Sequence, residues 1–274
     1  MLNKLSNKTY NKTDLKKWEV FVNRLKFPEK KIKIGLIGKY VELQDSYKSI
    51  LESLIHAGSE NKSTYVKFTH QKNDILHKLS ILHFDSPYAF DAGGLTLEEV
   101  NRNRSQGRER NIIFDSGESV RQSQIAWHYK TPFQSGELET TLHFSPRVYD
   151  GKLPFENGGI IKLERDFYGG MVLYRTSAKN RFGQGILGLD FQNQRDHRKR
   201  YANRTGLKGE QTLNQIERFS SASGFAIWSV PLGKSVFDLG LRYDRNQVAL
   251  NNRFAISELS YQRQFSQWSP HIGL

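Results

Sequence analysis

The 274 residues are enough for one or two domains with a sizeable core. The chain contains no cysteine, which excludes disulfides, zinc–thiolate sites and any cysteine nucleophile. Its formal charge of +13 is typical of proteins with an anionic partner. No window approaches the roughly 20 apolar residues of a membrane-spanning helix, so only a β-barrel could carry this chain through a membrane.

The composition changes sharply near residue 70. Residues 1–71 hold 13 Lys and one Arg, whereas residues 72–274 hold nine Lys and 18 Arg. Glycine rises from three residues in the first segment to 19 in the second. One gene under one codon bias seldom switches in this way, so the composition indicates that two unrelated pieces meet near residue 70.

The first segment is predicted to begin an α/β unit. Residues 1–13 are polar and lysine-rich and lack the apolar stretch of a secretory signal, so we expect no export signal. A helix is predicted between Asp14 and Pro28, with apolar residues spaced three and four apart. A buried strand follows over residues 32–38, and a second helix runs from Asp45 toward Gly58.

The residues after the predicted strand do not form a known phosphate-binding loop. Gly38-Lys39-Tyr40 matches neither the GxxxxGK[ST] nor the GxGxxG pattern. His56 is interpreted as a helix C-terminal residue favoured by the helix dipole and not as a ligand.

The run KIKIGLIGKYVELQDSYKSILESLIHAG, residues 31–58, resembles the start of the glutamine amidotransferase domain of CTP synthase, and the likeness covers about residues 14–68. That family makes CTP from UTP, ATP and glutamine-derived ammonia. The resemblance reaches neither its nucleotide-binding ligase domain nor its glutaminase cysteine and histidine–glutamate pair. Because this chain has no cysteine, that glutaminase chemistry cannot occur here, and no catalytic residue is carried over.

Residues 72–118 are predicted to be a junction and an irregular loop. His70, His77 and His83 are seven and six residues apart, which matches neither a helical nor a strand metal-ligand pair, so we expect no metal site. Arginines cluster here, but acidic residues interleave with them, which favours a solvated loop or short helix over a nucleic-acid surface. The arginines are Arg102, Arg104, Arg108 and Arg110.

From residue 119 onward the chain alternates apolar and polar residues, which predicts β-strands. The expected strands are 119–130, 136–146, 158–166, 169–177, 184–193, 216–229, 235–247 and 256–268. Short connections are expected at 131–135, 166–169 and 230–234, and longer ones at 147–157, 194–215 and 247–255. Strands of about nine to twelve residues, with short turns on one rim and long loops on the other, are typical of an outer-membrane barrel.

The clearest alternation lies in residues 219–244, a predicted hairpin linked by Pro231-Leu232-Gly233-Lys234. Its second strand carries one apolar row: Phe237, Leu239, Leu241 and Tyr243. In a soluble sandwich this row would face a core. In a membrane barrel it would face lipid, while Arg242 and Asp244 would line a watery lumen. Several aromatic residues lie near strand ends, as in interfacial girdles.

Residues 86–274 resemble the early barrel region of siderophore-type TonB-dependent outer-membrane receptors. The likeness is carried by PYAFDAGGLTLEEVNRNRSQGRERNIIFDSGESVRQSQI, by GLRYDR at 240–245 and by FSQWSPHIGL at 265–274. It implies uptake of a ferric siderophore or similar nutrient by the parent receptor, with TonB and the ferric chelate as partners. Members of this family also carry a signal, a TonB box and a plug, and we expect none of these here.

The sequence thus predicts a mainly β protein, a partial, open antiparallel transmembrane-type barrel of about eight strands preceded by a small α/β segment. The expected pieces are 1–71, 72–118 and 119–274. We expect no enzyme activity, no catalytic, cofactor-binding or metal residue, no cofactor and no nucleic-acid partner. The expected partner is outer-membrane lipid, and the isolated chain is expected to be inactive. Two alternatives are a CTP synthase remnant without catalytic residues and a basic, soluble, β-rich binding protein.

Overall fold

The computed structural model describes residues 16–28, 61–177, 183–254 and 260–274, in two compact units, Met1–Lys62 and Ser63–Leu274. In the first unit the described part is helix α1, Lys16–Lys26, which confirms the helix predicted after Asp14. Trp18 and Phe21 stack on one side of it, with ring centroids 5.3 Å apart. The predicted strand 32–38, the second helix and residues 1–13 lie outside the described residues.

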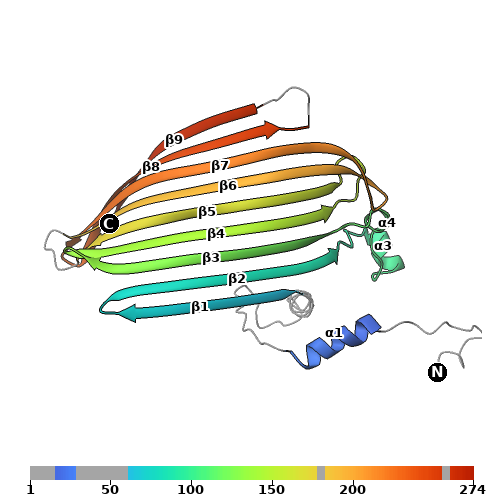
Figure 1. The fold of residues 1–274 in the computed structure, drawn as a ribbon, viewed down its shortest axis with the longest axis horizontal. Coiled ribbons are helices and arrows are strands. Elements are labelled where there is room, and N and C mark those ends of the chain that lie inside the picture. The colour runs from blue at the N-terminus through green and yellow to red at the C-terminus, as the bar shows by residue number, and fades with distance from the viewer. Residues whose placement is uncertain (1–15, 29–60, 178–182, 255–259) are drawn as a thin grey trace, which may run out of the picture. The chain divides into compact units, whose positions relative to one another are not determined.

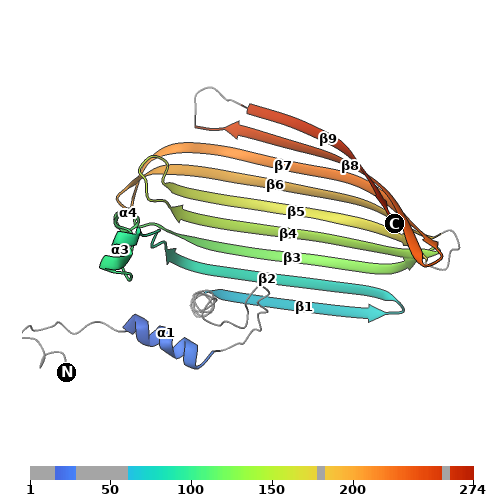
Figure 2. The same ribbon diagram turned by 180° about the vertical axis from the view of Figure 1, so that it is seen from behind.

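The second unit is one antiparallel sheet of nine strands in which each strand pairs with the next along the chain (Figure 1). The strands are β1 Lys62–Lys72, β2 Ile75–Phe90, β3 Gly117–Phe133, β4 Gly136–Lys152, β5 Ile160–Thr176, β6 Gln184–Arg204, β7 Leu207–Leu232, β8 Ser235–Asn252 and β9 Ser260–Gly273. β1 and β9 are the two edges of the sheet (Figure 2). This confirms the predicted open, mainly β architecture.

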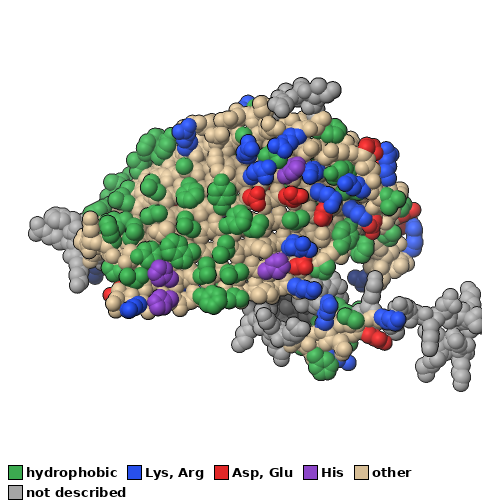
Figure 3. Space-filling model, viewed as in Figure 1, with side chains coloured by type: hydrophobic (Ala, Val, Ile, Leu, Met, Phe, Trp, Pro, Cys, Tyr) green, Lys and Arg blue, Asp and Glu red, His purple; other side chains and the backbone are tan. Residues whose placement is uncertain are grey.

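The sheet has an apolar face and a polar face, because successive side chains of a strand point to opposite sides. Leu239 and Leu241 lie on the apolar face and are 53% and 48% exposed. They are therefore not buried between two layers, as a soluble sandwich would require. Figure 3 shows hydrophobic side chains over the part of the sheet toward the short turns, and charged ones toward the opposite end.

The residues expected to be a junction between 72 and 90 instead form the end of β1 and all of β2. The reason lies in cross-strand packing: Leu79 lies opposite Trp127, and Ile81 lies opposite Ile125. The apolar residues of β2 recur every second position only over a few residues, and the histidines and lysine around them hide that period. The expected irregular stretch begins only after Phe90.

The predicted turn at 166–169 is wrong, because β5 is one continuous strand across it. Gly169 and Gly170 suggested a break. In the sheet Gly170 lies between Leu142 and Phe191, and a β-carbon there would come within 2.5 Å of the Leu142 side chain and 3.0 Å of the Phe191 ring. Glycine is needed at this point because two large neighbours cover the backbone.

The long loop predicted over 194–215 is also wrong, because β6 and β7 continue through it as a paired hairpin. The strands turn at Thr205 and Gly206, where φ is +48° and +91°. Backbone hydrogen bonds hold this ladder together although most of its side chains are polar. Residues 194–215 are too polar for a hydrophobic core, but they form paired strands and not a loop. The loop expected at 147–157 likewise shrinks to residues 153–159.

The two ends of the sheet differ, although less than predicted, because β6 and β7 at the long-loop end are also joined by only two residues. Turns of two residues join β1 to β2, β3 to β4 and β7 to β8. At the opposite end, residues 91–116 carry the short helices α3, Leu97–Arg102, and α4, Glu109–Ile113. β2 to β8 are 16 to 26 residues long. That exceeds the about nine to eleven residues a strand needs to cross hydrocarbon, and the surplus lies at the long-loop end.

No helix in the described part of the chain is long and apolar enough to span a membrane.

Candidate functional site on the polar face

Arg242 is the centre of one cluster on the polar face, between β6, β7 and β8. Its Nε lies 2.9 and 3.0 Å from the Asp244 carboxylate oxygens, and its Nη2 donates to Asp190 at 2.9 Å and to the Ser223 hydroxyl at 2.7 Å. The sequence placed Arg242 and Asp244 on one face, and the structure shows that they bind each other. The guanidinium is therefore engaged mainly in joining three strands.

A second cluster lies nearer the long-loop end, where one cross-strand row runs through Arg147, Arg165, Asp196 and Glu217. Arg165 binds Asp196 in a bidentate pair, Nε at 2.8 Å and Nη2 at 2.6 Å. The Asp196 side chain is only 1% exposed, and Gln194 donates to it at 3.2 Å. A carboxylate this deeply buried is stable only with such partners.

Arg198 and Glu217 form a third pair of the same kind, with Nε at 2.8 Å and Nη2 at 3.1 Å from the carboxylate. Arg198 follows Asp196 as the next residue on the polar face of β6. The two bidentate pairs therefore lie side by side and tie β5, β6 and β7 together. Sequence reasoning missed both pairs, because it read residues 194–215 as a loop and gave them no facing strand.

Two further arginines carry unused hydrogen-bonding capacity. Among the described residues, the buried Nε atoms of Arg147 and Arg200 have no hydrogen-bond partner. Arg147 lies beside Arg165 in the ladder, so like charges are neighbours there. A guanidinium in this position can donate hydrogen bonds to an anion such as a carboxylate. The polar face thus combines internally neutralised pairs with two arginines able to bind an acidic group.

The connection formed by residues 91–116 lies at the end of the polar face and is held by its own hydrogen bonds. The Asp91 carboxylate accepts from the Gly93 amide at 2.9 Å and from the Asn111 side chain at 2.9 Å. Asn203 of β6, which is 0% exposed, donates to the Phe114 carbonyl at 2.9 Å and to the Leu153 carbonyl at 3.1 Å. One buried amide therefore ties this connection and the neighbouring one to β6.

Helix α3 begins with a capping box. The Thr96 amide donates to the Glu99 carboxylate at 2.7 Å, and the Glu99 amide donates to the Thr96 hydroxyl at 3.3 Å. These bonds from Thr96 hold the pKa of Glu99 below its ordinary value.

The arginines of this connection lie on or beside two short helices, as the sequence predicted for part of the stretch. Arg102 pairs with Glu98 at 3.1 Å, and the Arg110 guanidinium lies 6.0 Å from the centre of the Phe114 ring.

The fold separates His83 from the other two histidines considered as metal ligands, His70 and His77. His83 bonds to the Ser123 hydroxyl at 2.9 Å. His70 and His77 face each other across the β1–β2 hairpin, with ring centroids 6.5 Å apart. The spacing of seven is therefore a cross-strand pair, which the sequence interpretation missed because it did not expect a hairpin there. No group of three or more His, Cys, Asp or Glu suited to a metal occurs in the ranges that the structure describes.

Aromatic side chains gather on the apolar face. Trp127 stacks with Tyr129 at 5.6 Å, and at the other side of the sheet Tyr243 lies 4.7 Å from Trp268. One cross-strand row connects Tyr129 with Trp268.

A single antiparallel layer with one apolar face, one charged face and unequal rims is typical of the wall of an outer-membrane β-barrel. Residues 61–274 match the family model "TonB dependent receptor-like, beta-barrel". The chain belongs to this family of outer-membrane receptors. Its fold is similar to that of the ferric citrate transporter FecA in the unliganded form, with a TM-score of 0.66 at 16% sequence identity. The match covers 77% of this chain and 33% of FecA.

The chain also contains a CTP synthase-like segment. CTP synthase of Christiangramia forsetii is 49% identical over 87 residues, which are 31% of this chain and 16% of that protein. CTP synthase of Flavobacterium johnsoniae is 60% identical over 50 residues, 18% of this chain and 9% of that protein. The chain thus spans less than a fifth of these relatives. It joins a small piece of one family to part of a receptor barrel, as the sequence predicted.

Proposed function

We propose that residues 61–274 form part of the wall of an outer-membrane receptor that takes up a ferric chelate. One observation carries this proposal: the same sheet presents Leu239 and Leu241 on one face and the Arg242 and Arg165 ion-pair clusters on the other. The first face suits lipid and the second suits a watery lumen. The family membership and the ferric citrate transport named for FecA support it.

Arg147 and Arg200 are proposed to contact the passing chelate or the receptor's plug. Both side chains are partly exposed on the polar face and their Nε atoms have no partner among the described residues, so the accessible part of each guanidinium can receive the carboxylates of an acidic chelate. The proposed partners of the complete receptor are outer-membrane lipid, TonB and the ferric chelate. Neither nucleic acid nor a cofactor is proposed.

The isolated chain is proposed to be inactive in transport. Within the part of the chain that the structure describes, β1 and β9 leave two unpaired edges, and each unsatisfied backbone group in hydrocarbon costs several kcal/mol. The CTP synthase-like segment is proposed to have no enzyme activity, because the chain has no cysteine for glutamine hydrolysis.

We propose that the two pieces meet near residue 71, where the composition changes. The start of the family match at residue 61 and the unit boundary after Lys62 both lie close to this position.

The test uses a chimera in which residues 61–274 replace the matching strands of FecA. We expect this chimera to reach the outer membrane and to run as a heat-modifiable barrel on gels. The complete 274-residue chain with a supplied export signal should give no uptake of radioactive ferric citrate in cells without FecA. Uptake by the chain alone, or a chimera that stays in the periplasm as soluble protein, would contradict the proposal.

A further inference from the structure

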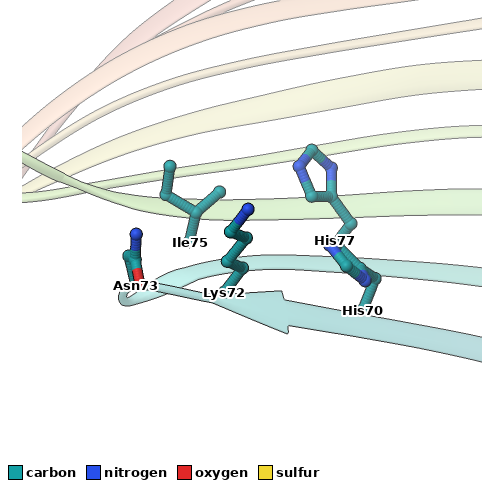
Figure 4. A pocket seen from close by; sticks show the side chains of 5 residues that line it. All are labelled: His70, Lys72, Asn73, Ile75 and His77. Atoms are coloured by element: carbon teal, nitrogen blue, oxygen red, sulfur yellow. The ribbon is translucent and has the colours of Figure 1, made fainter.

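A pocket of about 330 Å³ lies beside the two-residue turn between β1 and β2. Its lining combines a lysine, two histidines, an amide and one aliphatic side chain: His70, Lys72, Asn73, Ile75 and His77. Figure 4 shows these side chains beside the turn, with His70 and His77 contributed by the two facing strands. The pocket therefore offers one permanent positive charge and several hydrogen-bond donors.

Aromatic rings border this pocket on the β3 side. The His77 ring lies 4.9 Å from Tyr129 and 6.0 Å from Trp127, measured between ring centroids. Tyr129 belongs to the aromatic row of the apolar face, so the pocket opens on the side of the sheet that meets lipid. A basic pocket next to tyrosine and tryptophan is typical of the level at which lipid headgroups lie.

The turn fixes the depth of the pocket in the membrane. Asn73 and Asp74 form the tip of the hairpin and cannot remain in hydrocarbon, because their polar groups would lose water. Lys72 is adjacent to that tip, and His70 is only two residues further along the strand. The pocket thus lies at the boundary between hydrocarbon and water, at the rim of short turns, which in such barrels faces the periplasm.

We propose that this pocket binds the phosphate of a phospholipid headgroup in the periplasmic leaflet of the outer membrane. The proposal rests on the proposed function, because it requires the apolar face to lie in a bilayer. The Lys72 ammonium and the histidine N–H groups would donate to the phosphate oxygens, and the acyl chains would lie along the apolar face.

A metal ion fits the same residues less well. A metal about 2.1 Å from two imidazole nitrogens in tetrahedral geometry holds the ring centroids about 5 Å apart. The rings of His70 and His77 are 6.5 Å apart. The nearby Lys72 ammonium repels a cation and attracts an anion. Phosphate is therefore the chemistry that these residues favour.

The test measures lipid binding to the complete 274-residue chain in detergent micelles by native mass spectrometry. The probes are short-chain phosphatidylglycerol, inorganic phosphate and Ni²⁺. Lys72→Met, His70→Phe and His77→Phe remove donors while keeping the size of the side chains. His83→Phe is the matched control, because His83 bonds to Ser123 and does not line the pocket.

We expect each pocket variant to weaken phosphatidylglycerol binding about tenfold, the loss of one charge-assisted hydrogen bond, with no change in His83→Phe. Equal lipid binding by all four variants would overturn the proposal. So would stronger binding of inorganic phosphate than of the lipid, or Ni²⁺ binding that depends on both histidines while the lipid does not bind. Because uptake and barrel formation are not measured, failure here is distinct from failure of the chimera.

Discussion

At the scale of single residues, the lumen-side arginines act mainly through carboxylates on neighbouring strands. Arg165, Arg198 and Arg242 each engage a carboxylate through two nitrogens or bridge two carboxylates. The planar guanidinium suits this arrangement better than a lysine ammonium would. The rise of arginine over lysine after residue 71 thus has a structural use on the polar face.

Asp196→Ala should destabilise the sheet strongly. The change leaves Arg165 without its bidentate partner in a partly buried place, and breaking such a buried pair costs about 3 kcal/mol. The measurement is the urea midpoint of the chain in micelles. The double variant Arg165→Met/Asp196→Leu removes both charges and should recover much of the loss. A double variant as unstable as Asp196→Ala alone would show that the pair is not the cause.

Gly93→Ala should loosen the 91–116 connection. Gly93 has φ of +69°, and a β-carbon there would lie 2.5 Å from Asn111 Oδ1. Both the backbone strain and the clash oppose the substitution. Faster proteolysis within residues 91–116 would report it. Gly94→Ala is the control, because a β-carbon at Gly94 meets nothing within 4 Å. Equal proteolysis of the two variants would contradict this account.

The start of α3 should lose protection in acid. Because the Thr96 hydrogen bonds lower the pKa of Glu99, the ionised carboxylate stabilises the cap above its ordinary pKa of about 4.3. That stabilisation is lost as the pH falls through the lower folded-state pKa. Amide exchange of residues 97–102, corrected for intrinsic rates, should show the loss. Glu99→Gln should remove most of the pH dependence, whereas Glu98→Gln, which alters only the pair with Arg102, should keep it.

At the scale of elements, alternation alone predicted the faces of β8 and the hairpin to β7 correctly, because every second residue there is apolar. The turn shortened from the expected four residues to Gly233 and Lys234, since Pro231 and Leu232 remain paired with β8. The ends of the strands and the presence of the β1–β2 hairpin could not be predicted from the sequence. Extensions such as Arg195–Arg204 are held by ladder hydrogen bonds and ion pairs with β5 and β7, which a sequence read one segment at a time does not reveal.

A charge on the apolar face should block assembly, whereas one on the polar face should not. In the FecA chimera, Leu241→Arg places a guanidinium on the lipid face, where the cost is about 2–4 kcal/mol at the bilayer midplane and less near the interfaces. Asn246→Arg adds the same group on the polar face of the same strand. We expect the heat-modifiable fraction to fall only for Leu241→Arg. A fall of equal size in both variants would contradict the assignment of the two faces.

At the scale of the whole molecule, the described residues place no second layer on the sheet and contain few buried apolar side chains. They are Ile160, Ile161, Ala202 and Ile216. The stability of such a wall therefore comes from its ladders, from lipid on one face and from whatever fills the lumen on the other. Without these surroundings, exposed apolar side chains and two open edges remain in water.

The isolated chain should consequently aggregate in detergent-free buffer, and the aggregation should increase with concentration. Sedimentation velocity with and without detergent is the measurement. A monodisperse monomer without detergent, combined with salt-dependent retention of nucleic acid, would instead favour the basic soluble binding protein.

The strand count has one more consequence for whatever closes this wall. With nine strands in simple meander order, β1 and β9 run in the same direction. If the sheet closed on itself, β1 would therefore pair with β9 in parallel. An identical copy added in the same orientation would give the same parallel pairing. Every pair of neighbouring strands can be antiparallel only if the rest of the barrel contributes an odd number of strands. A 22-stranded transporter barrel would meet this condition.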